Sequence, residues 1–159
     1  MVRTARSFDQ DPRFGLITLA EVALRALSPA VNDPGTAIDV IGRETRLLTT
    51  WYQAQADRGR AELADPRLSV RPITCQDLFE DAFNLIGRDG AAQIDIMLRL
   101  VKSLAALGRI GTAESRRAAD HQLQLAYERA MESVPIADDR ARLSSAASRL
   151  RLGLDAQDR

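Results

Sequence analysis

The stretch RALSPAVNDPGTAIDV, from Arg25 to Val40, gathers residue types that bind ions at the ends of helices. A guanidinium at Arg25, beside the free N–H groups of a helix N-terminus, would suit a phosphate or carboxylate ligand. Alternatively, Asn32, Asp33 and Asp39 would offer oxygen ligands to a cation. Either arrangement would make this stretch a binding site for a small ion.

The same residues also suit a purely structural turn between two helices, which is the interpretation we favour. Pro29 disfavours the α conformation in the residue before it, so a helix should end at Ser28. Asp33 followed by Pro34 is a favoured helix start, because the carboxylate accepts an orphan N–H and proline lacks one. Thr36 stands where its hydroxyl would join this cap. A capping carboxylate at Asp33 would compete with an anion for the same donors.

Two side chains should complete the turn. Val31 is expected to point inward and anchor it. Arg25 lies one turn before the helix end, where it would reach the last carbonyls of its own helix or pair with Asp33.

Other residues with reactive or metal-binding side chains do not form a known pattern. His121 has no second histidine to share a zinc ion, and it is predicted to lie on a helix surface. Cys75, the only cysteine, falls in a helix's first turn, where the dipole would lower its pKa. Asp77, Glu80 and Asp81 would suit a hard cation, but a solvated helix face is the favoured interpretation. We therefore predict no catalytic residue, metal ligand or cofactor, which favours a non-enzymatic protein over an enzyme.

These residues must be positioned by helices, because apolar side chains recur at helical spacing along the chain. The first helix should begin at Pro12, and the third at Thr74, with Asp77 in a capping box. Gly87 and Gly90 should stop the third. The six apolar stripes are Ile17, Ala20, Leu24 and Leu27; Ala37, Ile41, Leu48 and Trp51; Phe79, Ala82, Phe83 and Ile86; Ile94, Met97, Val101 and Leu104; Ala119, Leu123, Ala126 and Ala130; and Leu143, Ala147 and Leu150.

The predicted fold class is therefore all-α. We expect a single domain over residues 1–159, formed by a bundle of about six helices with short loops and one longer loop near residues 58–73. The ordered core should cover about 12–152, with frayed tails at 1–10 and 153–159.

Charge and hydropathy exclude several classes of partner. The chain has 22 basic and 22 acidic residues, so it has no overall attraction for nucleic acid. No apolar run reaches the length of a membrane span, because Glu21 and Arg25 interrupt the best candidate. We expect this chain alone to be soluble and to have no nucleic-acid partner.

The segment SFDQDPRFGLITLAEVALRALSPAVNDPGTAI resembles the signature of predicted bacterial membrane proteins catalogued as domain of unknown function 2254. The family pattern has Gln-Asp-Pro, a following Gly, an apolar helix into Arg-Ala-Leu-Ser-Pro, then Asn-Asp-Pro and Thr-Ala. It falls here on Gln10, Asp11, Pro12, Phe14, Gly15, Arg25, Ala26, Leu27, Ser28, Pro29, Asn32, Asp33, Pro34, Thr36 and Ala37. Ala30 and Gly35 depart from the pattern, in which a Gly and a larger residue are usual.

The resemblance implies a C-terminal soluble part of a longer, membrane-associated protein, on an unspecified side of the membrane. It implies no established activity. Our leading hypothesis is a non-catalytic self-assembly or partner-interaction module that forms a homo-oligomer through its first helices. On this hypothesis, contact with the membrane comes only through segments of the parent protein that are absent from this chain.

The alternative hypothesis is a site that senses a small anion or metal ion, or has hydrolase-like activity, around the RALSPAVNDP loop. Its candidate ligand-binding residues are Gln10, Asp11, Arg25, Ser28, Asn32, Asp33 and Thr36. The first two lie at the start of a helix that spans roughly 25 Å, so one chain would not join them to the others. A dimer with antiparallel first helices would bring the two groups together.

Overall fold

A computed structural model describes residues 11–58 and 73–155, and all six helices predicted from the sequence are present there. They are α1 (Pro12–Leu27), α2 (Pro34–Arg58), α3 (Cys75–Asp89), α4 (Ile94–Ile110), α5 (Ala113–Ser133) and α6 (Ala137–Asp155). The prediction of an all-α bundle is thus confirmed. The expected tail at 1–10 and most of the expected loop at 58–73 lie outside the described residues, and the expected tail at 153–159 lies partly outside them.

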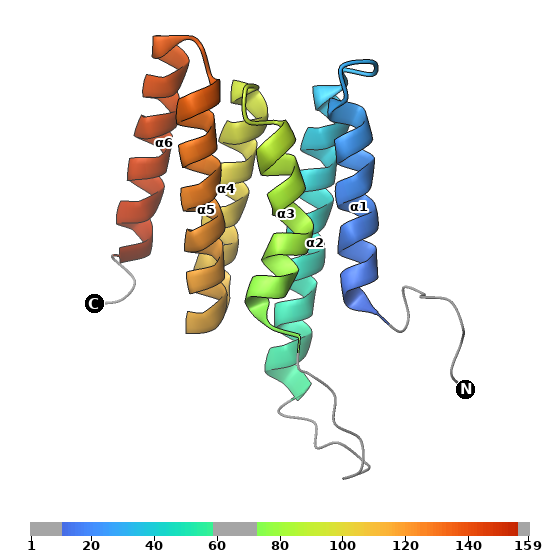
Figure 1. Ribbon diagram of the computed structural model, residues 1–159. Helices are drawn as coiled ribbons and strands as arrows, with labels where there is room; N and C mark the ends of the chain where they lie inside the picture. Colours follow the sequence, from blue (N-terminus) through green and yellow to red (C-terminus); the bar gives the residue numbers. More distant parts are fainter. Residues whose placement is uncertain (1–10, 59–72, 156–159) are drawn as a thin grey trace.

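The helices form two layers of three, and consecutive helices run in opposite directions (Figure 1). Helices α1, α3 and α5 pack side by side in one layer, and α2, α4 and α6 form the other. Helix α1 lies at the end of its layer and packs only against α2 and α3 among the described helices. It therefore has fewer neighbours than α3 or α4 in the middle of the bundle.

Local capping explains where several helices begin. The Asp11 carboxylate accepts the backbone N–H groups of Arg13 and Phe14 at 3.0 and 3.3 Å, and a proline follows it at the first helical position. Thr74 and Asp77 form the predicted capping box at the start of α3. These caps supply partners for helix donors that would otherwise be unsatisfied.

The core contains most of the predicted apolar stripes and a short row of aromatic rings. The stripe of α1 is corrected: Ile17 and Leu24 are only partly buried, and Leu16 and Ala23 belong to the core in their place. Tyr52, Phe79 and Phe83 follow one another with ring centroids 6.5 and 5.9 Å apart. In α1, Ala20 and Ala23 are fully buried, and their small side chains leave room for the neighbouring helices.

Gly87 does not stop α3 as predicted. It lies inside the helix, and a Cβ added there would lie 3.3 Å from the Leu100 side chain of α4. Gly90 alone is the C-cap, with its N–H bonded to the Ile86 carbonyl at 2.8 Å. The glycine at 87 thus permits close packing of two helices.

Candidate functional site

The turn between α1 and α2 satisfies most of its own polar groups. The Ser28 hydroxyl donates to the Arg25 carbonyl at 2.7 Å, and the Asp33 N–H donates to the Ala26 carbonyl at 2.8 Å. The Asp33 carboxylate accepts the Thr36 N–H and hydroxyl at 3.0 and 2.6 Å, as predicted. These two bonds lower the pKa of Asp33, the hydroxyl contributing most. Asn32 has φ 46°, a left-handed conformation that asparagine tolerates.

Two expectations for this turn are corrected. Val31 does not anchor it, because its side chain is 59% exposed. Arg25 forms an exposed ion pair with Glu21 at 4.0 Å rather than a pair with Asp33. The tight backbone hydrogen bonds hold the turn, so it needs no apolar anchor.

The seven candidate ligand-binding residues separate into two groups. Arg25, Ser28, Asn32, Asp33 and Thr36 lie at or beside the turn. Asp11, by contrast, caps the opposite end of α1, and Gln10 lies outside the described residues. One chain therefore brings the first group together but not the second with it.

Replacement of Asp33 distinguishes a capping role from an ion-binding role. Asp33→Ala should lower the melting temperature, whereas Asp33→Asn should lower it much less, because asparagine also caps helices. Thermal unfolding with and without phosphate or Mg²⁺ measures both effects. Asp39→Ala, at an exposed acid of the same helix, is the control. An ion that stabilises wild type but not Asp33→Asn would instead show that the turn is a binding site.

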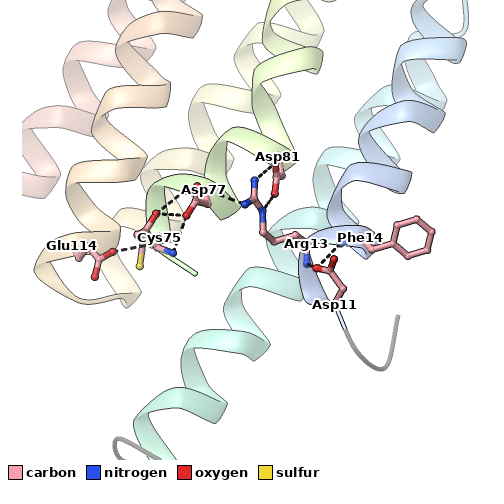
Figure 2. A network of polar contacts seen from close by, with 8 residues as sticks. Asp11, Arg13, Phe14, Cys75, Asp77, Asp81 and Glu114 are labelled. Carbon is pink, nitrogen blue, oxygen red and sulfur yellow. Dashed lines mark hydrogen bonds and ion pairs between the residues drawn. The ribbon is translucent and has the colours of Figure 1, made fainter. Parts of the chain in front are cut away.

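Of the three α3 acids predicted to lie on a solvated face, Glu80 is exposed as predicted, whereas Asp77 and Asp81 are partly buried in an ion-pair network. Asp81 is only 12% exposed and accepts two hydrogen bonds from the Arg13 guanidinium, at 2.5 and 3.0 Å. Asp77 lies 3.7 Å from the same guanidinium (Figure 2) and also caps its own helix. Arg13 therefore connects α1 to α3, and Asp81 in turn raises the pKa of Arg13.

Glu44 of α2 is the unusual residue beside this ion pair. Its side chain is fully buried, and neither carboxyl oxygen has a hydrogen-bond partner within the described structure. Burial, with a further contribution from the Asp81 charge, raises the pKa of Glu44 to about 9. The carboxyl group is therefore protonated at neutral pH.

The sequence contains a signal for Glu44 that we did not use. Ala37, Ile41 and Leu48 define the buried stripe of α2, and Glu44 follows Ile41 by three residues and precedes Leu48 by four. Such spacing places all four side chains on one face of a helix. A charged residue within an apolar stripe was the sign of a buried acid.

An apolar groove of about 560 Å³ lies where α1 meets α2 and α3. Leu19 of α1, Leu47 and Trp51 of α2 and Leu78 of α3 line it, among other mainly apolar side chains. Leu47 is 47% exposed, and Val22 on α1 is also exposed. Exposed apolar surface of this kind is typical of interaction sites.

A second buried polar group, the Tyr52 hydroxyl of α2, lies near Cys75 at the start of α3, and burial raises its pKa. The Cys75 N–H donates to the Glu114 carboxylate at 3.0 Å (Figure 2). Burial first, and the Glu114 charge second, raise the pKa of the Cys75 thiol, contrary to the lowering expected from the helix dipole. This thiol is therefore a weak nucleophile at neutral pH.

Metal ligands are not gathered anywhere in residues 11–58 and 73–155, which hold no group of three or more His, Cys, Asp or Glu suited to an ion. His121 is exposed on α5, as predicted. The distinctive features are thus a protonated carboxyl, an ion pair beside it and an adjacent apolar groove.

Sequence comparisons extend the resemblance seen in the first helices. Residues 1–106 match the family described as predicted membrane protein DUF2254. An uncharacterised protein of Mycobacterium bovis and uncharacterised proteins from two strains of Mycobacterium tuberculosis are each 32% identical to this chain over 147 residues. The alignments cover 91% of this chain and 28% of each relative, so the chain spans little more than a quarter of their length. No solved structure matches it.

None of the described helices has the length and hydropathy needed to cross a membrane. The family match nevertheless covers more than half of the sequence, and it includes the turn, the ion pair and Glu44. The chain therefore belongs to the DUF2254 family of predicted membrane proteins.

Proposed function

We propose that this chain is a non-catalytic assembly domain of a membrane protein, in which the groove between α1 and α2 binds the same face of a second copy. The observation that carries the proposal is the groove itself, which is apolar and includes the half-exposed Leu47. Burying such side chains against an equivalent surface would release them from water.

The position of the groove supports a helical occupant. Helix α1 ends one layer of the bundle, and α2 ends the other. Helices inside the bundle have neighbours on both sides in their layer, whereas α1 and α2 each have one. A second α1–α2 pair would continue both layers with the same kind of helix packing.

The ion pairs on α1 and α2 favour a second copy over a strongly charged partner. Glu21 and Arg25 form an ion pair on α1, and Asp39 and Arg43 form one on α2. A twofold axis that sets the α1 helices antiparallel would bring the acid of each pair toward the base of the other. The chain has no formal net charge, so two copies do not repel each other.

The polar residues of the α1–α2 turn support a structural role rather than catalysis. Ser28, Asp33 and Thr36 bond to their own turn, and their donors and acceptors serve the two helix ends. A catalytic group would instead be directed toward a substrate.

Sedimentation of wild type and Leu47→Glu over a concentration series tests the proposal. We expect wild type to dimerise reversibly, and a buried charge at Leu47 to weaken the dimer at least about tenfold. Ile110→Glu is the matched control, because Ile110 is 53% exposed and does not line the groove. A strictly monomeric wild type, or equal weakening by Ile110→Glu, would overturn the proposal.

A further inference from the structure

Glu44 lies at the seam between three helices, one turn from the groove. It precedes Leu48 by one turn of α2, and Asp81 follows Leu78 by about one turn of α3. Leu48 and Leu78 both line the groove together with Leu16 of α1. The two acids therefore occupy the next level of the same seam, where they interact electrostatically.

Among the described residues, the charged groups around Glu44 provide no cation for it. From α3, the Asp81 carboxylate repels a negative charge on Glu44. From α1, Arg13 is already bound to Asp81 and lies 3.7 Å from Asp77. From α4, the Arg99 guanidinium lies beside Gly42, which is two residues from Glu44 and so on the opposite side of α2. A bound proton is the remaining way to neutralise Glu44 inside the bundle.

Ionisation of Glu44 would require water to reach its carboxylate, and displacement of α1 is the least costly way to admit it. Among the described helices, α1 packs only against α2 and α3, whereas α4 packs against four. Elements with fewer packed neighbours separate at lower free energy. Arg13 forms ion pairs with Asp77 and Asp81, and these join the start of α1 to α3.

We propose that the Glu44 carboxyl is a proton-binding site that controls the packing of α1. With the proton bound, α1 closes over α2 and α3. When the proton leaves, α1 separates and the carboxylate becomes hydrated. This proposal does not depend on the groove being a dimer interface, because it concerns contacts within one chain.

Amide hydrogen exchange between pH 6 and 9 tests the proposal on wild type and Glu44→Gln. After correction for intrinsic exchange, wild-type protection of α1 should fall by up to about tenfold per pH unit, while the variant's protection stays level. At every pH, protection of α1 should be lower than that of the slowest-exchanging amides of α5, because α1 opens without global unfolding. Glu80→Gln, at an exposed acid of α3, is the control and should behave as wild type.

Two results would overturn the proposal. Equal protection of α1 and of the slowest-exchanging α5 amides at every pH would mean that the proton leaves Glu44 only on global unfolding, and equal α1 protection in wild type and Glu44→Gln would mean that its proton has no effect. Glu44→Leu replaces Glu44→Gln if the glutamine variant does not fold. In the Leu47→Glu background, the pH dependence of α1 protection should persist. Its loss in that background would mean that it arises from assembly of two copies and not from the packing of α1 within one chain.

Discussion

Replacing Glu44 with glutamine is expected to make the domain more stable at pH 7 by about 2 kcal/mol. The pKa of Glu44 rises from 4.5 to about 9 on folding, so the carboxyl must take up a proton when the chain folds at neutral pH. Each pH unit above the unfolded pKa costs about 1.4 kcal/mol, or about 3 kcal/mol at pH 7. Burial of the glutamine amide costs about 1 kcal/mol, which reduces the gain to about 2 kcal/mol. Urea unfolding of both proteins measures the difference.

The same two proteins should differ in how their stability depends on pH. Because folding raises the pKa of Glu44, its contribution is most favourable below pH 4.5 and is lost as the pH rises toward 9. The advantage of Glu44→Gln should therefore grow from pH 5 to pH 9 and then level off. Equal pH profiles would contradict the assignment of a protonated buried acid.

Replacing Arg13 with glutamine is expected to destabilise the domain by about 2 kcal/mol. The change leaves Asp81, which is 12% exposed, without its cation and next to Glu44. Breaking a fully buried pair costs about 3–5 kcal/mol, and we expect less here because the Arg13 side chain is 36% exposed. Urea unfolding at pH 7 gives the value directly.

Two further variants show whether this loss comes from the uncompensated charge. Arg43→Gln removes an arginine whose ion pair with Asp39 is exposed, and it should cost less than about 0.5 kcal/mol. Asp81→Asn in the Arg13→Gln background should recover much of the lost stability, because no unpaired charge then remains. No recovery in the double variant would point to lost packing of the Arg13 side chain.

Features determined by neighbours in sequence could be predicted. The starts of α1 and α3 follow from Asp11 and Thr74, because a cap bonds to residues two or three positions along the chain. The turn at Asp33 is equally local, and its carboxylate binds Thr36 as the sequence indicates. The prediction that Val31 points inward was wrong, because backbone hydrogen bonds rather than apolar burial hold that turn.

The candidate site depends on contacts that are distant in sequence. Asp81 bonds to Arg13, which lies 68 residues earlier in the sequence, so no local pattern showed that this acid is paired and largely buried. Glu44 is fully buried because α2 packs against three helices, and its spacing alone did not reveal which acids are near it. The groove likewise arises only from the juxtaposition of α1, α2 and α3.

Trp51 gives the groove its own optical probe. It is the single tryptophan of the chain, it is partly buried, and it lies on the groove wall. Its fluorescence therefore comes from one known place and needs no label. Covering the groove with a second copy would shift the emission to shorter wavelength, whereas separation of α1 would hydrate the indole and shift it to longer wavelength. One spectrum, recorded against concentration and then against pH, would follow both processes through the same side chain.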